Sequence, residues 1–142
     1  MESILVHTHS GIRWIFLLML LFVLFKNHNN PVDDPRKKID WPLYTLVLFL
    51  LQILLGFVLY FFSHNVSFDS GFMQNSQHRF FTIEHETGML LAFIIMLIGY
   101  IKSRRTLMSN WNKVIKTWYL ISLIIILLSI PWPFRGFGNS WF

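Results

Sequence analysis

The chain has 142 residues, of which 54% are hydrophobic and 13% are charged, and its formal net charge is +5. This composition is typical of a membrane protein rather than a soluble one, and the length fits one domain. The absence of cysteine excludes disulfides, thiolate metal sites, iron–sulfur clusters and Cys-attached haem. The basic residues cluster beside apolar segments, as membrane flanks do, so the positive charge does not indicate nucleic-acid binding.

Four apolar segments, each long enough to cross a bilayer, follow one another along the chain. A bilayer core about 30 Å thick needs roughly 20 residues of helix. The predicted helices lie at about residues 4–26, 41–63, 80–102 and 114–132. The sequence therefore predicts an all-α fold, an integral membrane up-down four-helix bundle in the lipid bilayer, with residues 1–142 forming a single transmembrane domain.

The distribution of basic residues predicts how the bundle is oriented. The side of the membrane that holds the termini has only Arg79 and Arg135, with Arg13 further into the first helix. The positive-inside rule places the two basic loops in the cytoplasm, so both termini are predicted to lie outside. The first segment does not resemble a cleaved signal peptide and is predicted to be retained. The basic residues of the two loops are Lys26, Arg36, Lys37, Lys38, Lys102, Arg104, Arg105 and Lys113.

The third segment carries ionisable residues inside its membrane-spanning length. Only residues 87–101 are uncharged, and at 1.5 Å per residue they span about 22 Å. To cross the membrane, the helix must begin near residue 80, which brings Glu84, His85 and Glu86 inside the edge of the hydrocarbon. Ionisable groups at that depth are costly and usually face a bundle interior, a partner or a cofactor.

The first segment repeats this arrangement. After Arg13 only residues 14–25 are free of charge, about 18 Å of helix, so the helix must reach back to about residue 4. That places His9 and Arg13 in the outer part of the membrane, four residues apart and on one helical face. Because the first and third helices run in the same direction, His9 and His85 are predicted to lie at matching depth.

Two histidines at matching depth are suited to hold a haem between them. In an up-down bundle the first and third helices are diagonal, and neighbouring axes 8–10 Å apart give a diagonal of roughly 12–14 Å. That is about the separation that two imidazoles and a porphyrin iron require. Arg79 and Arg135, both near the outer surface, are candidates to neutralise propionates, and Gly88 is a candidate to let a flat macrocycle approach the backbone.

Several of these residues have alternative interpretations. A single intramembrane histidine is more often an interhelical hydrogen-bonding contact than a ligand, and glycine is as often a helix-packing residue as a clearance for a cofactor. Gln52 is predicted to bond across helices. Arg13 is predicted to meet Glu84 or Glu86, a haem propionate, or a water bound to either, so that no charge is alone in low dielectric. One of the two carboxylates, beside a coordinated imidazole, is also a candidate to fix the ring tautomer. Of the other histidines, His7 and His78 are alternative ligands, and His28 and His64 are predicted to be solvated.

Three short motifs carry a resemblance to known proteins: His-Ser-Gly-Ile-Arg-Trp at residues 9–14, Glu-His at 84–85 and Ile-Pro-Trp-Pro-Phe-Arg at 130–135. The chain resembles, over nearly its whole length, small four-helix bacterial membrane proteins catalogued as cytochrome b. It is more loosely similar to cytochrome b561-type and haem A synthase-type units, which hold b-type haem between transmembrane histidines. The resemblance implies His9 and His85 as the axial pair. The chain departs from the two-haem b561 pattern because it lacks a second pair of histidines deep on the cytoplasmic side.

The sequence thus predicts a b-type cytochrome in a bacterial cytoplasmic (inner) membrane, with one haem b and its iron near the periplasmic face. It would transfer electrons from quinol or a neighbouring respiratory-complex subunit, and this is favoured over a stand-alone enzyme. One alternative is a haem-free accessory subunit whose buried polar residues form a packing network in a larger complex. Another is a proton or metal-ion path through His9, Glu84, His85 and Glu86, which lacks a polar continuation to the cytoplasmic side.

Overall fold

The computed structural model describes residues 2–26 and 39–136. Within these ranges all regular structure is helical, and four helical stretches are long and apolar enough to cross a membrane. The first two are α1 (Glu2–Phe25) and α2 (Trp41–Phe62), and the last is α5 (Met108–Ser129). This agrees with the predicted all-α, membrane-type fold, and it suggests a multi-pass membrane protein.

The third stretch is one continuous helix built from three parts. A short α3 (Ser76–Arg79) leads into a π-helical segment, η1 (Phe80–Glu84), and then into α4 (His85–Arg105). The helix begins four residues earlier than the sequence predicted, because Asn75 caps it: the Asn75 side chain accepts hydrogen bonds from the first backbone N–H groups of α3. Single π-helical turns inside α-helices often occur at functional sites, and this one ends directly before His85.

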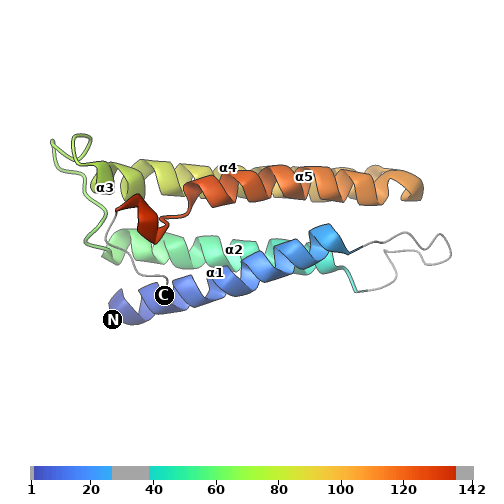
Figure 1. Cartoon of the computed structure of the whole chain (residues 1–142), viewed down its shortest axis with the longest axis horizontal. Coiled ribbons are helices and arrows are strands. Elements are labelled where there is room, and N and C mark those ends of the chain that lie inside the picture. The colour runs from blue at the N-terminus through green and yellow to red at the C-terminus, as the bar shows by residue number, and fades with distance from the viewer. Residues whose placement is uncertain (1, 27–38, 137–142) are drawn as a thin grey trace.

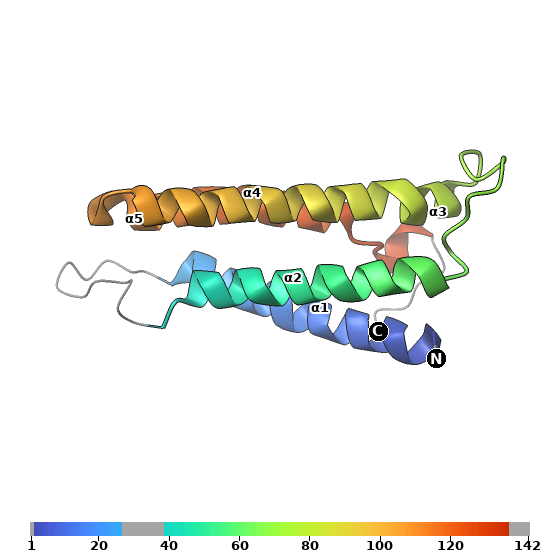
Figure 2. The ribbon, with the colours of Figure 1, turned by 180° about the vertical axis from the view of Figure 1, so that it is seen from behind.

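The helices form two layers, α1 with α2 and α4 with α5 (Figure 1). Contacts within each layer are the most extensive, and contacts of α2 with α4 and of α1 with α5 join the layers. The first and third spanning helices, α1 and α4, therefore occupy diagonal positions, as the up-down order predicts. The N-terminus lies at the same end of the bundle as α3 and the short 3-10 helix η2 (Pro133–Arg135), as Figure 2 shows from behind.

The connection between α4 and α5 is much shorter than predicted. Residues 103–113 were expected to form most of a basic loop, but only Thr106 and Leu107 separate the two helices. Thr106 has an extended backbone conformation that ends α4. The basic side chains do not break the helices, because they lie at the surface; the Lys102 ammonium lies 4.7 Å from the centre of the Trp118 ring.

Apolar side chains fill the space between the layers and also cover the outside of the bundle. Phe16 and Phe49 stack in the core with ring centroids 4.5 Å apart. On the outside Leu54, Ile98 and Leu128 are exposed, as expected for side chains that face lipid. In helices suited to span a membrane, polar groups inside the bundle need a specific explanation.

One polar cluster ties α2 to α4 at the end of the bundle that holds the short connection. Asp40 caps α2 by accepting a hydrogen bond from Leu43 N. The other carboxylate oxygen of Asp40 accepts a hydrogen bond of 2.7 Å from the Tyr100 hydroxyl and lies 3.6 Å from a guanidinium nitrogen of Arg104. The cluster fixes the helix ends and lies far from the histidines.

Candidate functional site: a histidine-lined cavity between the layers

A cavity of about 750 Å³ lies between the two layers in the half of the bundle that holds the N-terminus. Its size falls within the usual range of ligand sites, roughly 300–1,000 Å³. Most of its lining is apolar, and all four spanning helices contribute to it. Its main polar side chains are His9, Arg13, Gln52, Tyr60, Thr82, His85 and Glu86.

His85 is held by a hydrogen bond from its ring to the end of α5. Its Nδ1 atom lies 2.7 Å from the carbonyl oxygen of Ser129. A carbonyl oxygen only accepts, so Nδ1 carries the proton and donates it, and Nε2 is the nitrogen left for a ligand. Metal-bound histidines almost always donate their other ring N–H in this way. The bond therefore sets the tautomer that coordination through Nε2 requires.

The end of α5 supplies this carbonyl because its last turn has no helical partners. The helix ends at Ser129, and the prolines at 131 and 133 have no N–H to donate. Side chains bind the freed carbonyls instead, so the Ile-Pro-Trp-Pro-Phe-Arg motif acts as a helix cap. The three pairs are Trp132 Nε1 with Leu127 at 2.8 Å, an Arg135 guanidinium nitrogen with Leu128 at 2.9 Å, and His85 Nδ1 with Ser129 at 2.7 Å.

Gly88 lies one turn after His85, where α4 and α5 approach each other closely. A Cβ atom built on Gly88 would overlap the side chain of Ser129. The glycine thus lets the end of α5 come close enough for His85 to reach the Ser129 carbonyl. Gly88 contacts α5 and is not among the residues that line the cavity. Its neighbours fit the helix-packing alternative and not a clearance for a macrocycle.

His9 approaches the cavity from α1, on the other layer, and its ring rests on Gly56 of α2. A Cβ built on Gly56 would lie 3.3 Å from His9 Cε1, and 3.9 Å from both His9 Nδ1 and Glu86 Oε1. The side chains of His9 and Glu86 therefore both approach Gly56. Among the described residues, buried Nδ1 of His9 has no hydrogen-bond partner.

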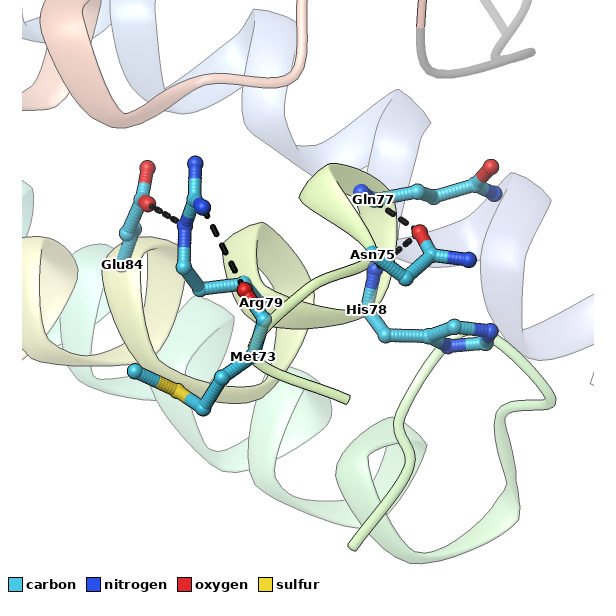
Figure 3. A network of polar contacts seen from close by, with 6 residues as sticks. All are labelled: Met73, Asn75, Gln77, His78, Arg79 and Glu84. Atoms are coloured by element: carbon cyan, nitrogen blue, oxygen red, sulfur yellow. Dashed lines mark hydrogen bonds and ion pairs between the residues drawn. The ribbon is translucent and has the colours of Figure 1, made fainter. Parts of the chain in front are cut away.

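The two glutamates of the Glu-His-Glu motif point in different directions. Glu86 lines the cavity, whereas Glu84 lies at the surface and pairs with Arg79 (Figure 3). Arg79 Nε lies 2.9 Å from Glu84 Oε1, with the side chains 42% and 47% exposed, so the pair contributes roughly 0–1 kcal/mol. A guanidinium nitrogen of Arg79 also donates to the Met73 carbonyl at 3.4 Å. Arg79 is thus engaged away from the cavity.

Of the eight predicted site residues, the structure brings four together around the cavity and leaves four outside it. The four that line it are His9, Arg13, His85 and Glu86. Arg135 faces the cap of α5, with its guanidinium 5.2 Å from the centre of the Phe80 ring. The four that do not line the cavity are Arg79, Glu84, Gly88 and Arg135.

The remaining histidines have separate surroundings. His7 is exposed and lines the cavity, while the ring of His78 lies 2.9 Å from the Asn65 carbonyl, in the connection between α2 and α3. His64 is exposed, as predicted. The prediction for His28 lies outside the described residues. No group of three or more His, Cys, Asp or Glu side chains arranged for a bare metal ion occurs in residues 2–26 and 39–136.

Sequence reasoning missed two parts of the site. The connection between α2 and α3 contributes Ser63, Asn65 and Val66 to the cavity wall, and no periodic pattern in the sequence indicates this. Gln52 was predicted only to bond across helices; it does so, donating from Nε2 to the His9 carbonyl at 2.8 Å, but it also lines the cavity. The signal in the sequence for this second role was that Gln52 is a lone amide side chain in an otherwise apolar helix.

Comparison with family models, with curated proteins and with solved structures found no match for this chain. The class of protein is therefore defined by the fold and the candidate site alone. It is a helical protein with four candidate membrane spans that enclose a cavity lined by histidines from two diagonal helices.

Proposed function

We propose that this protein is a membrane-bound b-type cytochrome, which holds one haem b between His9 and His85 and transfers electrons. The observation that carries the proposal is the hydrogen bond from His85 Nδ1 to the Ser129 carbonyl, made by a residue that lines a cavity shared with His9. A haem with two imidazole ligands carries one electron by cycling between its ferric and ferrous states. The resemblance of three motifs to proteins catalogued as cytochrome b supports the same assignment.

The residues present fit such a cofactor. The two imidazoles come from diagonal helices in opposite layers, so a flat ring placed between the layers would lie between them. The apolar lining suits a porphyrin face and excludes water. The stacked rings of Phe16 and Phe49, which also line the cavity, bring the apolar core up to it.

Arg13 is the cation that the cavity offers to a propionate. It is half-buried and lines the cavity, whereas Arg79 and Arg135 are engaged elsewhere. A guanidinium binds a carboxylate through two parallel hydrogen bonds, which suits this task. Of the three arginines predicted to bind the cofactor, Arg13 is therefore the one that we propose neutralises a propionate.

The proposed setting is a bacterial cytoplasmic membrane, with both termini and the cavity on the periplasmic side. The excess of Lys and Arg at the opposite end of the bundle supports this orientation. Electrons would come from a quinol or from a neighbouring redox subunit.

An absorption spectrum of the purified protein tests the proposal. A sharp Soret band and a narrow α-band on reduction are expected of haem with two histidine ligands. A colourless preparation with full helicity, obtained from cells that make haem, would overturn it.

One observation favours the haem-free accessory subunit as a second candidate. Several polar side chains inside the bundle already have structural bonds: Gln52 to His9, His85 to Ser129, and Ser122, whose hydroxyl donates to the Ala92 carbonyl at 2.7 Å. Such a network would hold the helices together without a cofactor. The spectrum separates the two candidates.

A further inference from the structure

Gln52 carries an acceptor that the protein itself does not satisfy. The residue is 6% exposed and lines the cavity. Its amide orientation is fixed, because Nε2 must be the atom that donates to the His9 carbonyl at 2.8 Å. Its carbonyl oxygen, Oε1, is buried and has no hydrogen-bond partner among the described residues. A buried acceptor of this kind requires a donor from a water or a ligand.

A haem does not supply that donor. Ionised propionates accept hydrogen bonds, and the porphyrin faces and edges are apolar, so Gln52 Oε1 would stay unsatisfied beside a haem. The missing partner is a hydroxyl or an N–H group. The cavity walls around Gln52 are apolar, with Phe49, Ile53 and Phe57 among the lining residues, which suits an aromatic ring that carries such a group.

The cavity has an open side between α2 and α4. Phe57 on α2 and Leu90 on α4 line the cavity, yet they are 57% and 53% exposed on the outside of the bundle. Thr87, one turn before Leu90, is also exposed and lines the cavity. Because the outside of the spanning helices faces lipid, this side opens to the bilayer and not to water.

The opposite side, between α1 and α5, is covered. The segment that follows α5 folds back there, and η2 lies over the space between the layers (Figure 1). Trp132 of this segment contacts Trp14 of α1, with ring centroids 6.3 Å apart. Seen from behind, α2 and α4 face the viewer, and among the described segments only the connection between α2 and α3, at one end of the bundle, passes from one layer to the other on this side (Figure 2). Among the described residues, the side between α2 and α4 is therefore the more open lateral route for a ligand from the membrane.

We infer that a lipid-soluble hydroxyaromatic molecule enters the cavity from the bilayer between α2 and α4 and donates a hydrogen bond from its hydroxyl to Gln52 Oε1. Its apolar tail stays in the opening lined by Phe57 and Leu90. Within this class we name a quinol, a choice that rests on the proposed electron transfer. The required donor also sets a preference: the dihydroxy form satisfies Gln52, and the corresponding quinone, which only accepts, does not.

The first test compares the binding of a short-tailed benzoquinol and its quinone to the full-length protein in lipid nanodiscs, without oxygen, by tryptophan fluorescence. The quinol should bind about tenfold more tightly, the effect of one hydrogen bond. Gln52→Leu should remove this preference, and Gln52→Glu, which keeps an acceptor oxygen, should retain it. Thr45→Val is the matched control, because Thr45 is fully buried on the same helix and bonds only within α2. Equal affinities of quinol and quinone in the wild type would overturn the inference.

The second test addresses the lateral route. Leu90→Trp should slow the binding of the tailed quinol several-fold, whereas Leu91→Trp should not, because Leu91 is 49% exposed and does not line the cavity. Equal rates in the two variants would contradict entry between α2 and α4. Neither test needs haem, and haem content is measured on the same samples. If a colourless, haem-free protein still bound quinol more tightly than quinone, the quinol site would be supported and the proposed assignment as a cytochrome would be wrong.

Discussion

His85 at the start of α4 donates a hydrogen bond to the backbone carbonyl of Ser129 at the end of α5, with 2.7 Å between Nδ1 and the oxygen. The contact selects the tautomer of a candidate ligand and joins the two helices of one layer beside the cavity. Because the acceptor is a backbone atom, its position depends on how closely α5 approaches α4. The glycine one turn after His85 controls that approach.

The two candidate axial histidines should be individually necessary. His9→Ala and His85→Ala should each abolish or severely reduce low-spin haem, because a six-coordinate iron needs both imidazoles. His64→Ala is the control, since His64 is exposed and does not line the cavity. Difference spectra and haem content per protein measure the effect. Wild-type spectra in both ligand variants would show that the proposed pair is wrong.

Gly88 should act as a positioning residue for His85. Gly88→Ala forces Ser129 away and weakens its bond to His85, so the imidazole becomes a poorer electron donor and the midpoint potential of the haem should rise. Gly99→Ala is a matched control, because its Cβ would overlap Trp118 at the same pair of helices but away from the cavity. Both substitutions should lower stability by about 1–3 kcal/mol through overpacking.

The potential separates the positioning role of Gly88 from a merely structural one. Redox titration of both glycine variants should show a shift in Gly88→Ala alone. Equal shifts in the two variants, or none in either, would contradict the positioning role.

The helices and part of the site could be predicted because they follow from segment lengths. The uncharged runs after Arg13 and after Glu86 are too short to cross a bilayer, and this placed His9 and His85 in the half of the bundle that holds the N-terminus, where the cavity lies. Diagonal packing of the first and third helices followed from the up-down order. The first conclusion needs only the rise per residue and the thickness of the membrane, and the second needs only the order of the helices.

Roles that depend on local geometry could not be predicted. Arg79 and Arg135 lie at the expected end of the bundle, but Glu84 and the Leu128 carbonyl engage them. Neither partner can be identified without knowing the π-helical segment before His85 and the conformation of the chain after α5. The start of α5 was placed six residues late because charged residues were taken as loop, although Lys and Arg are good helix formers.

The orientation of the bundle can be tested without a thiol background, because the chain has no cysteine. Ser70 lies in the connection between α2 and α3, and Ser109 lies near the start of α5, at the other end of the bundle; both are exposed. A cysteine at Ser70 should react with a membrane-impermeant maleimide added to spheroplasts, and one at Ser109 only after lysis. The reverse pattern would place the cavity on the cytoplasmic side.

The charge of Arg13 should matter more than its shape. An Arg inside a spanning helix costs roughly 2.5–3.5 kcal/mol on insertion scales, so it is retained for an interaction inside the bundle. Glu86 lines the same cavity, whereas Glu84 is engaged by Arg79 at the surface. Arg13→Leu should therefore be more harmful than Arg13→Lys, because it leaves the Glu86 carboxylate uncompensated in low dielectric.

A double substitution isolates the charge effect. Arg13→Leu combined with Glu86→Gln should recover part of the folded yield and thermal stability that Arg13→Leu loses, since neither charge is then left alone. Arg13→Leu combined with Glu84→Gln should recover nothing, because Glu84 lies with Arg79 at the surface. Both double variants are compared with Arg13→Leu by size-exclusion chromatography and thermal unfolding in detergent. Equal recovery in the two, or equal damage from Arg13→Leu and Arg13→Lys, would show that Arg13 does not compensate a carboxylate in the cavity.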